Sequence, residues 1–174
     1  MRSITKNIVP IYKGDIPHIL EIERISYPSI QTEKALVKAF RAQEVRGVKI
    51  EDRNGKIVGF MMFRCFMLDV FEIWFLTISP KSRRMGHGSS LIEYLMKRLS
   101  NLAHGWGISI KVNEYNLTGQ LFLQSCGFRC EGIVRQCCSI PDEEAQNNLL
   151  MVYRKPSCPH NRLQSGGGFD VTDV

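Results

Sequence analysis

Residues 70–90, VFEIWFLTISPKSRRMGHGSS, join an apolar segment to a basic loop and then to the start of a helix. The first part, Val70–Ser79, has the length and apolar character of a largely buried strand. After the loop, Gly86–Asn101 repeats apolar residues at spacings of three and four, which predicts an amphipathic helix. The stretch therefore predicts a strand, a turn and a helix in immediate succession.

The loop between this strand and this helix has the features of an anion-binding site. The first backbone N–H groups of a helix have no partner within it, and the helix dipole favours negative charge at that end. Gly86 and Gly88 let the backbone approach a phosphate closely, while Lys81, Arg83 and Arg84 add positive charge. An ordinary basic surface turn is the alternative interpretation, but the position between strand and helix favours a phosphate-binding loop.

Segments on both sides of this unit complete the expected fold. Asn54-Gly55 is typical of a hairpin turn, and Gly127 closes a short helix. Because hairpins come first and a strand–helix–strand unit lies in the middle, we expect an α+β fold with a mixed sheet rather than a doubly wound one. The expected elements, in chain order, are a strand at Asn7–Tyr12, helices at Asp15–Ser26 and Thr32–Ala42, strands at Val48–Glu51, Ile57–Phe66 and Val70–Ser79, a helix at Gly86–Asn101, a strand at Gly107–Val112, a helix at Thr118–Ser125, and strands at Gly132–Ile140 and Asn147–Arg154.

The composition is that of one globular domain with a short tail. The chain has 174 residues, 44% hydrophobic and 23% charged, which fits one domain at residues 1–155. Pro156–Val174 contains a Ser-Gly-Gly-Gly run and is expected to be a disordered tail. The formal net charge of +6 favours anionic ligands, but no run of basic residues interleaved with aromatics points to nucleic acid.

No targeting or membrane-spanning segment is recognisable in the sequence. The N-terminus lacks the apolar core of a signal peptide. The longest apolar stretch, Gly59–Phe71, is interrupted by Arg64 and Asp69. We therefore expect a cytoplasmic protein that does not bind membranes, and six free cysteine thiols. The cysteines form no paired C-x-x-C array, so no metal site is expected.

Several motifs in combination give the sequence a resemblance to a known family. Arg83-x-x-Gly86-x-Gly88, with Ile78-Ser79-Pro80 before it, is similar to the acetyl-CoA motif of GNAT acetyltransferases. The segment Asn116–Phe128, an Asn followed by a short helix ending in Gly-Phe, resembles their second signature. Ile19–Pro28 resembles the branch that acetylates protein N-termini, typified by the ribosomal-protein alanine N-acetyltransferases. The resemblance covers about Ile4 to Arg154.

This resemblance implies a fold and a cofactor site. In the family, the pantetheine of acetyl-CoA lies between two splayed parallel strands, here Val70–Ser79 and Gly107–Val112, in a mostly antiparallel sheet of about seven strands with flanking helices. A backbone N–H near Thr77 or Ile78 would polarise the thioester carbonyl. The residues that the resemblance assigns to acetyl-CoA are Leu76, Thr77, Ile78, Arg83, Arg84, Met85, Gly86, His87, Gly88, Ser89 and Asn116.

Acetyl transfer to an amine needs a base for the substrate ammonium and an acid for the departing thiolate. Lys111 and Leu123 stand where the N-terminal branch of the family carries Glu and Tyr. Glu72 has the spacing of the general base in the histone-acetyltransferase branch, and its apolar neighbours predict a raised proton affinity; a solvated strand residue is the alternative. Tyr115 is the candidate acid and Tyr27 the candidate wall of the acceptor groove, with structural packing as the alternative for both.

Three functions fit these motifs. The first is transfer of an acetyl group from acetyl-CoA to a primary amine at a protein N-terminus, and the second is acetylation of a small-molecule amine by the same fold. The third is a degenerate GNAT domain that binds acyl-CoA without turning it over, or serves as an interaction module. A P-loop nucleotide-binding protein is disfavoured, because the Lys and Ser or Thr of that motif do not follow Gly88.

Overall fold

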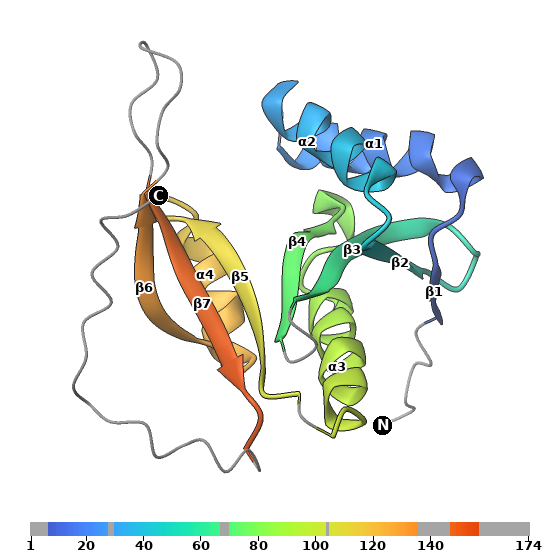
Figure 1. Ribbon diagram of the computed structural model, residues 1–174. Coiled ribbons are helices and arrows are strands. Elements are labelled where there is room, and N and C mark those ends of the chain that lie inside the picture. Colours follow the sequence, from blue (N-terminus) through green and yellow to red (C-terminus); the bar gives the residue numbers. More distant parts are fainter. Residues whose placement is uncertain (1–6, 28–29, 67–69, 104, 136–146, 157–174) are drawn as a thin grey trace, which may run out of the picture.

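The computed structural model describes residues 7–27, 30–66, 70–103, 105–135 and 147–156, which form one sheet flanked by helices (Figure 1). The order of strands and helices along the chain is the one expected from the sequence. The elements are β1 (Asn7–Pro10), η1 (Lys13–Asp15), α1 (Ile16–Ser26), α2 (Ile30–Arg41), β2 (Val45–Glu51), β3 (Ile57–Phe66), β4 (Val70–Ile78), η2 (Pro80–Ser82), α3 (His87–Ser100), β5 (Gly107–Asn113), α4 (Leu117–Ser125), β6 (Arg129–Arg135) and β7 (Asn147–Arg154).

The strands form a single seven-stranded sheet in the order β1-β2-β3-β4-β5-β7-β6. Every neighbouring pair is antiparallel except β4 and β5, which run parallel. A parallel pair needs a crossover connection, and α3 provides it between β4 and β5. The expected mixed and mostly antiparallel α+β fold is therefore confirmed.

Each face of the sheet is covered by a pair of helices, because successive strand residues point to opposite faces. On one face, α3 and α4 pack against a core that includes Met61 and Phe63 of β3. On the other face, α1 and α2 pack against Phe60 and Met62 of the same strand. A slip of β3 by one residue would exchange these two apolar sets, so the two cores fix the register of the central strands.

The parallel strands β4 and β5 separate in the middle of the sheet. They pair over Val70–Ile73 and Gly107–Ile110. Beyond this segment β4 continues to Ile78 and β5 to Asn113, and the described strands no longer pair with each other. Figure 1 shows the two strands diverging toward the end of the molecule that carries α1 and α2.

A β-bulge lies where the strands separate. Met62 of β3 pairs with Phe75 of β4, while the next residue, Phe63, pairs with Ile73. Trp74 is therefore the extra residue of β4. A bulge bends the strand that carries it and increases its twist, which explains why β4 leaves β5 at this point.

Most predicted elements are confirmed, with ends that differ by a few residues. β2 begins three residues before its predicted start, because Val45 pairs with Arg64 of β3. β1 ends at Pro10, two residues before its predicted end. The predicted continuation of β6 to Ile140 and the tail after Pro156 lie outside the described residues. In the described part of the chain, no helix is long and apolar enough to cross a membrane.

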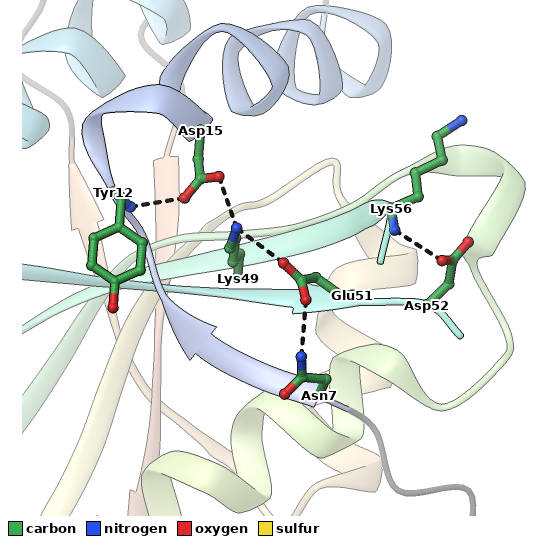
Figure 2. Close-up of polar contacts among 7 residues, drawn as sticks. All are labelled: Asn7, Tyr12, Asp15, Lys49, Glu51, Asp52 and Lys56. Atoms are coloured by element: carbon green, nitrogen blue, oxygen red, sulfur yellow. Dashed lines mark hydrogen bonds and ion pairs between the residues drawn. The ribbon is translucent and has the colours of Figure 1, made fainter. Parts of the chain in front are cut away.

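A network of charged groups ties the start of α1 to the edge of the sheet (Figure 2). The Lys49 Nζ lies 2.7 Å from Asp15 Oδ1 and 3.0 Å from Glu51 Oε1. Asp15 Oδ2 accepts the Tyr12 backbone N–H at 2.8 Å, and Glu51 Oε2 accepts the Asn7 amide at 2.9 Å. The Lys49 side chain is only 11% exposed, so its charge depends on these two carboxylates.

Replacing Lys49 with Met is expected to destabilise the fold by about 2–4 kcal/mol, because it leaves two largely buried carboxylates without their cation. Burial opposes ionisation of Asp15, but the hydrogen bonds from Lys49 and Tyr12 still lower its pKa. A carboxylate with a lowered pKa stabilises the fold above its unfolded pKa of about 3.9 and loses that contribution as the pH falls through the folded value. Urea unfolding at pH 7 and pH 3 measures the free energy of unfolding of both proteins. The difference between the parent and Lys49→Met should be smaller at pH 3 than at pH 7.

The contribution of Lys49 to stability depends on pH in the opposite sense, because it is lost at high pH rather than at low pH. Burial opposes the charge of Lys49, yet its bonds to Asp15 and Glu51 raise its pKa. The stabilisation is thus complete below the unfolded pKa of Lys and is lost as the pH rises through the folded value. Lys56→Met is the matched control, because Lys56 is exposed and its contact in Figure 2 is made by its backbone N–H. Equal destabilisation by the two variants would contradict a structural role for the network.

Candidate active site

A cleft of about 530 Å³ opens where β4 and β5 separate. Its wall combines the diverging strands with residues from α1, α2, α4 and β7. Among the predicted site residues, the structure brings Tyr27, Leu76, Thr77 and Asn116 together in this wall. They come from positions up to 89 residues apart in the chain, between Tyr27 and Asn116. The separation of the parallel strands thus creates the cleft.

The other predicted residues lie outside this wall, including the whole basic loop from Arg83 to Ser89. Ile78, Glu72 and Tyr115 are not part of the described cleft wall. The Tyr115 side chain is 77% exposed, and its backbone N–H donates to Asn113 Oδ1 at 2.8 Å. Asn116 begins α4, where its Oδ1 accepts the Gly119 N–H at 3.0 Å. This is an N-cap role, which keeps the amide at the edge of the cleft.

The basic loop meets the N-terminus of α3 at a glycine with a left-handed backbone. Gly86 has φ +74° and ψ +10°, and it is the N-cap residue of the helix. Its carbonyl accepts the backbone N–H of Ser90 at 3.1 Å and the Ser90 hydroxyl at 3.0 Å. Arg84 also has a positive φ, +62°, which is uncommon for a residue with a side chain. Arg83 donates from Nε to the Ile78 carbonyl at 3.2 Å, so this side chain lies against the end of β4.

The two glycines of the motif have different roles. Gly86 needs its positive φ, whereas Gly88 lies within the first turn of α3. A Cβ added at Gly88 would meet Cζ of Phe122 at 3.0 Å, so the second glycine allows α4 to pack closely against α3. Close approach of the backbone is therefore needed at Gly88 for helix packing, and a positive φ is needed at Gly86 alone of the two. His87 between them is buried, so its ring does not face the loop surface.

The backbone of β4 offers hydrogen bonds to the cleft at alternate residues. The Ser79 N–H donates to the Val58 carbonyl of β3 at 2.9 Å. Because backbone groups alternate between the two edges of a strand, Thr77 also bonds toward β3, while Leu76 and Ile78 present their N–H and C=O groups to the open edge. Of the two predicted N–H donors, Thr77 therefore faces β3, and the donors on the open side are Leu76 and Ile78.

Glu72 is an ion-paired carboxylate. Its Oε2 accepts Arg64 Nε at 2.7 Å and the Trp74 indole N–H at 3.1 Å, and its Oε1 lies 3.9 Å from Lys111 Nζ. Burial alone would raise the pKa of Glu72, but the hydrogen bonds from Trp74 and Arg64 and the charges of Arg64 and Lys111 lower it. The predicted raised proton affinity is wrong, because the apolar neighbours in the sequence are outweighed by cations from β3 and β5.

If the protein carries out the acetyl transfer that the sequence resemblance implies, Glu72→Gln is expected to change its rate by less than about fivefold, because the amide keeps the hydrogen-bond acceptor and loses only a partly exposed ion pair. The measurement is steady-state thiol release from acetyl-CoA with a saturating amine. A loss of two or more orders of magnitude would instead identify Glu72 as the base.

A second carboxylate, Glu23, lies in the cleft wall. Its residue is only 3% exposed, and Oε2 accepts the Thr77 hydroxyl at 2.7 Å. The other carboxylate oxygen accepts no side-chain hydrogen bond from the described residues. Burial raises the pKa of Glu23, and the hydrogen bond from Thr77 offsets only part of this effect. A buried carboxyl of raised pKa beside a cleft has a higher proton affinity than an exposed one, which suits a general base.

Glu23 was not among the residues singled out from the sequence, although a signal was present. It follows Ile19 by four residues and Ile16 by seven, so it falls on the apolar face of α1. An acid on that face is placed next to the core rather than in solvent. Its partner Thr77 is 54 residues away, and only the packing of α1 on β4 reveals the contact.

The thiols and acids of the described residues show no metal site. Cys65, Cys126 and Cys130 are free, and no group of three possible metal ligands is found among these residues. Burial raises the pKa of Cys126, which keeps its thiol protonated at neutral pH.

The sequence matches the model of a known family. The sequence model of the acetyltransferase (GNAT) family matches residues 16–128, more than half of the chain. The chain belongs to the GNAT family of acetyltransferases. No curated protein sequence is significantly similar to it.

Solved structures share the fold at low sequence identity. The ribosomal-protein-S18-alanine N-acetyltransferase from Escherichia coli has a TM-score of 0.72 and 18% identity, covering 92% of this chain and 100% of that one. Arabidopsis thaliana NAA60 in complex with a bisubstrate analogue has a TM-score of 0.72 and 16% identity, covering 86% and 98%. The spermidine/spermine N-acetyltransferase SpeG from Vibrio cholerae has a TM-score of 0.64 and 18% identity, covering 86% and 92%.

Proposed function

We propose that this protein is an acetyl-CoA-dependent N-acetyltransferase whose acceptor is a primary amine, with a protein N-terminus as the acceptor of choice. The observation that carries the proposal is a cleft with the N-terminus of α3 beside it, since Phe122 of the cleft wall packs against Gly88 in the first turn of that helix. The glycine-capped N-terminus of α3 lies at the end of β4, and the buried carboxylate of Glu23 lies in the wall where β4 leaves β5. Family membership and the structural likeness to the ribosomal-protein-S18-alanine N-acetyltransferase support the same class of reaction.

The chain's residues fit acetyl-CoA. The left-handed Gly86 and the first N–H groups of α3 form a cradle for a pyrophosphate, and exposed Arg83 and Arg84 supply positive charge beside it. The open edge of β4 offers the N–H groups of Leu76 and Ile78 to a carbonyl oxygen and to the amides of an extended ligand. Acetyl-CoA would supply an activated acetyl thioester at this edge.

Glu23 is the residue placed to receive the proton of the acceptor ammonium. Its carboxylate lies in the cleft wall with one oxygen held by Thr77 and the other available to an incoming amine. A raised pKa makes this carboxylate a better base than an exposed one, because burial destabilises its charged form. Tyr27, at the end of the same helix, lines the cleft with a side chain that is partly exposed and forms part of the acceptor wall.

The test is release of CoA thiol from acetyl-CoA by the full-length protein, with acetylated products identified by mass spectrometry. Peptides with a free N-terminus, the same peptides with a blocked N-terminus, and spermidine form the acceptor panel. Acetylation of the free α-amine is the expected result. Binding of CoA without turnover of any amine would support the degenerate domain instead, and absence of CoA binding would overturn the proposal.

A further inference from the structure

The acceptor side of the cleft carries positive charge that an ammonium substrate would not select. Lys111 of β5 lines the cleft, and its side chain is 53% exposed. The charged residues of the described wall are Lys111 and Glu23, and Glu23 is buried. Lys111 is 3.9 Å from Glu72, whose closer partner is Arg64 at 2.7 Å. The accessible charge within the wall is therefore a cation.

A basic stripe on α2 continues from the same cleft. Ala35 of α2 belongs to the cleft wall, and Lys38 follows it by three residues, which makes the two neighbours on the helix surface. Lys34, Lys38 and Arg41 are spaced four and three residues apart and are all exposed. They lie along one side of the helix, which we call the α2 basic stripe. Figure 1 shows α2 at the end of the molecule toward which β4 and β5 diverge.

The acidic residues near the α2 basic stripe do not neutralise its positive charge. Glu33 of α2 pairs with Arg24 of α1 at 3.1 Å, so its charge is already matched. Glu21 is the exposed acid of α1, since Glu23 of the same helix is buried. Lys34, Lys38 and Arg41 make no ion pair with the described residues, and their charges remain available to a partner.

We propose that the acceptor is a polypeptide whose free N-terminus is followed by acidic residues. The α-amine would enter the cleft beside Glu23, Lys111 would meet a carboxylate close to it, and the α2 basic stripe would meet the acidic side chains that follow. Repulsion between this basic surface and a cationic acceptor raises the free energy of their complex, and attraction to an acidic peptide speeds its association. The surface therefore favours acidic peptides over polyamines. This inference rests on the proposed acetyl transfer and narrows its acceptor.

The test compares three eight-residue peptides with the same first residue, followed by glutamates, glutamines or lysines. The acidic peptide should have a kcat/KM at least about tenfold above that of the basic peptide at low ionic strength, and the ratio should shrink as salt is added. Binding is measured independently by fluorescence anisotropy of the C-terminally labelled acidic peptide with CoA present. The triple variant K34E/K38E/R41E should lose this binding and reverse the order of the peptides.

The matched control is R53E/K56E/K97E, which changes the net charge equally at exposed positions of the β2–β3 turn and of α3. It should keep the preference for the acidic peptide. Equal turnover of all three peptides, or a preference for the basic peptide or spermidine, would overturn the inference while leaving acetyl transfer intact. Tighter binding of a single-stranded RNA than of the acidic peptide, lost in the α2 variant, would overturn it in favour of a nucleic-acid surface. Binding of the acidic peptide without acetylation of any amine would instead reject the proposed function alone.

Discussion

Glu23→Gln is expected to lower the rate of acetyl transfer by about 10²–10⁴-fold, the usual contribution of a general base. Glutamine keeps the size of the side chain and the acceptor for the Thr77 hydroxyl, which lies 2.7 Å from the carboxylate. Only the capacity to take a proton is lost. The affinity for CoA, measured by isothermal titration, should stay within about twofold, because the residue lies on α1 and the phosphate cradle lies on α3.

The pH dependence separates a base from a structural residue. In the parent protein, kcat should rise with pH through a carboxyl titration, displaced upward because burial raises the pKa of Glu23. Glu23→Gln should lose this limb. Thr77→Val removes the hydrogen bond that favours the charged carboxylate, so it should move the limb to still higher pH while leaving most of the plateau rate. Thr77→Ser should restore the parent profile.

The thermal stability of Glu23→Gln provides a second test, and the direction of the expected change can be stated. An acid with a raised folded pKa opposes folding at pH values above its unfolded pKa, because the buried charge must be formed in the folded state. Glu23→Gln should therefore melt at the same temperature as the parent or slightly higher at pH 7. A loss of activity together with a lower melting temperature would point to damaged packing, and a rate close to the parent rate would exclude Glu23 as the base.

The fold could be predicted from local patterns because those patterns coincide with its cores. The apolar spacing of α3, the Asn54-Gly55 turn and the strand alternation of β3 each specify their element, and the observed sheet uses all of them. What local patterns could not supply is the bulge at Trp74, which depends on how β3 pairs with β4. The cleft opens where that bulge bends β4 away from β5, so the residues of its wall could not be predicted from the sequence.

The candidate site also contains some features that local sequence patterns predict and others that depend on contacts in space. The candidate phosphate-binding loop is contiguous in sequence, so the strand, turn and helix that build it could be predicted locally, and Gly86 lies at the start of α3 as expected. The pKa of Glu72 was predicted from its neighbours along the strand, but the groups that determine it, Arg64 and Lys111, come from β3 and β5. Glu23 depends on a contact between α1 and β4. Proton affinity is set by what surrounds a group in space, so the sequence can nominate carboxylates but cannot rank them.

Gly86→Val is expected to weaken binding of CoA by about 10²-fold or more while leaving the sheet intact. Gly86 has φ +74°, a left-handed conformation that a β-branched side chain adopts only with strain. Relief of that strain would turn the peptide groups at the start of α3, whose N–H groups form the phosphate cradle. The loss of one or two hydrogen bonds to a charged phosphate costs about 1.5–3 kcal/mol each, which accounts for the expected change in affinity. Isothermal titration with CoA measures it directly.

Gly55→Val is the matched control for this prediction. Gly55 has φ +76° in the turn between β2 and β3, and a Cβ added there would have no neighbour within 4 Å. The two variants therefore carry similar backbone strain, but only one carries it at the N-terminus of α3. Similar losses of thermal stability combined with loss of CoA binding in Gly86→Val alone would locate the phosphate cradle at this helix. Gly86→Asn, a residue that tolerates the left-handed region, should recover part of the affinity. Parent-like affinity in Gly86→Val would mean that the pyrophosphate binds elsewhere on the chain.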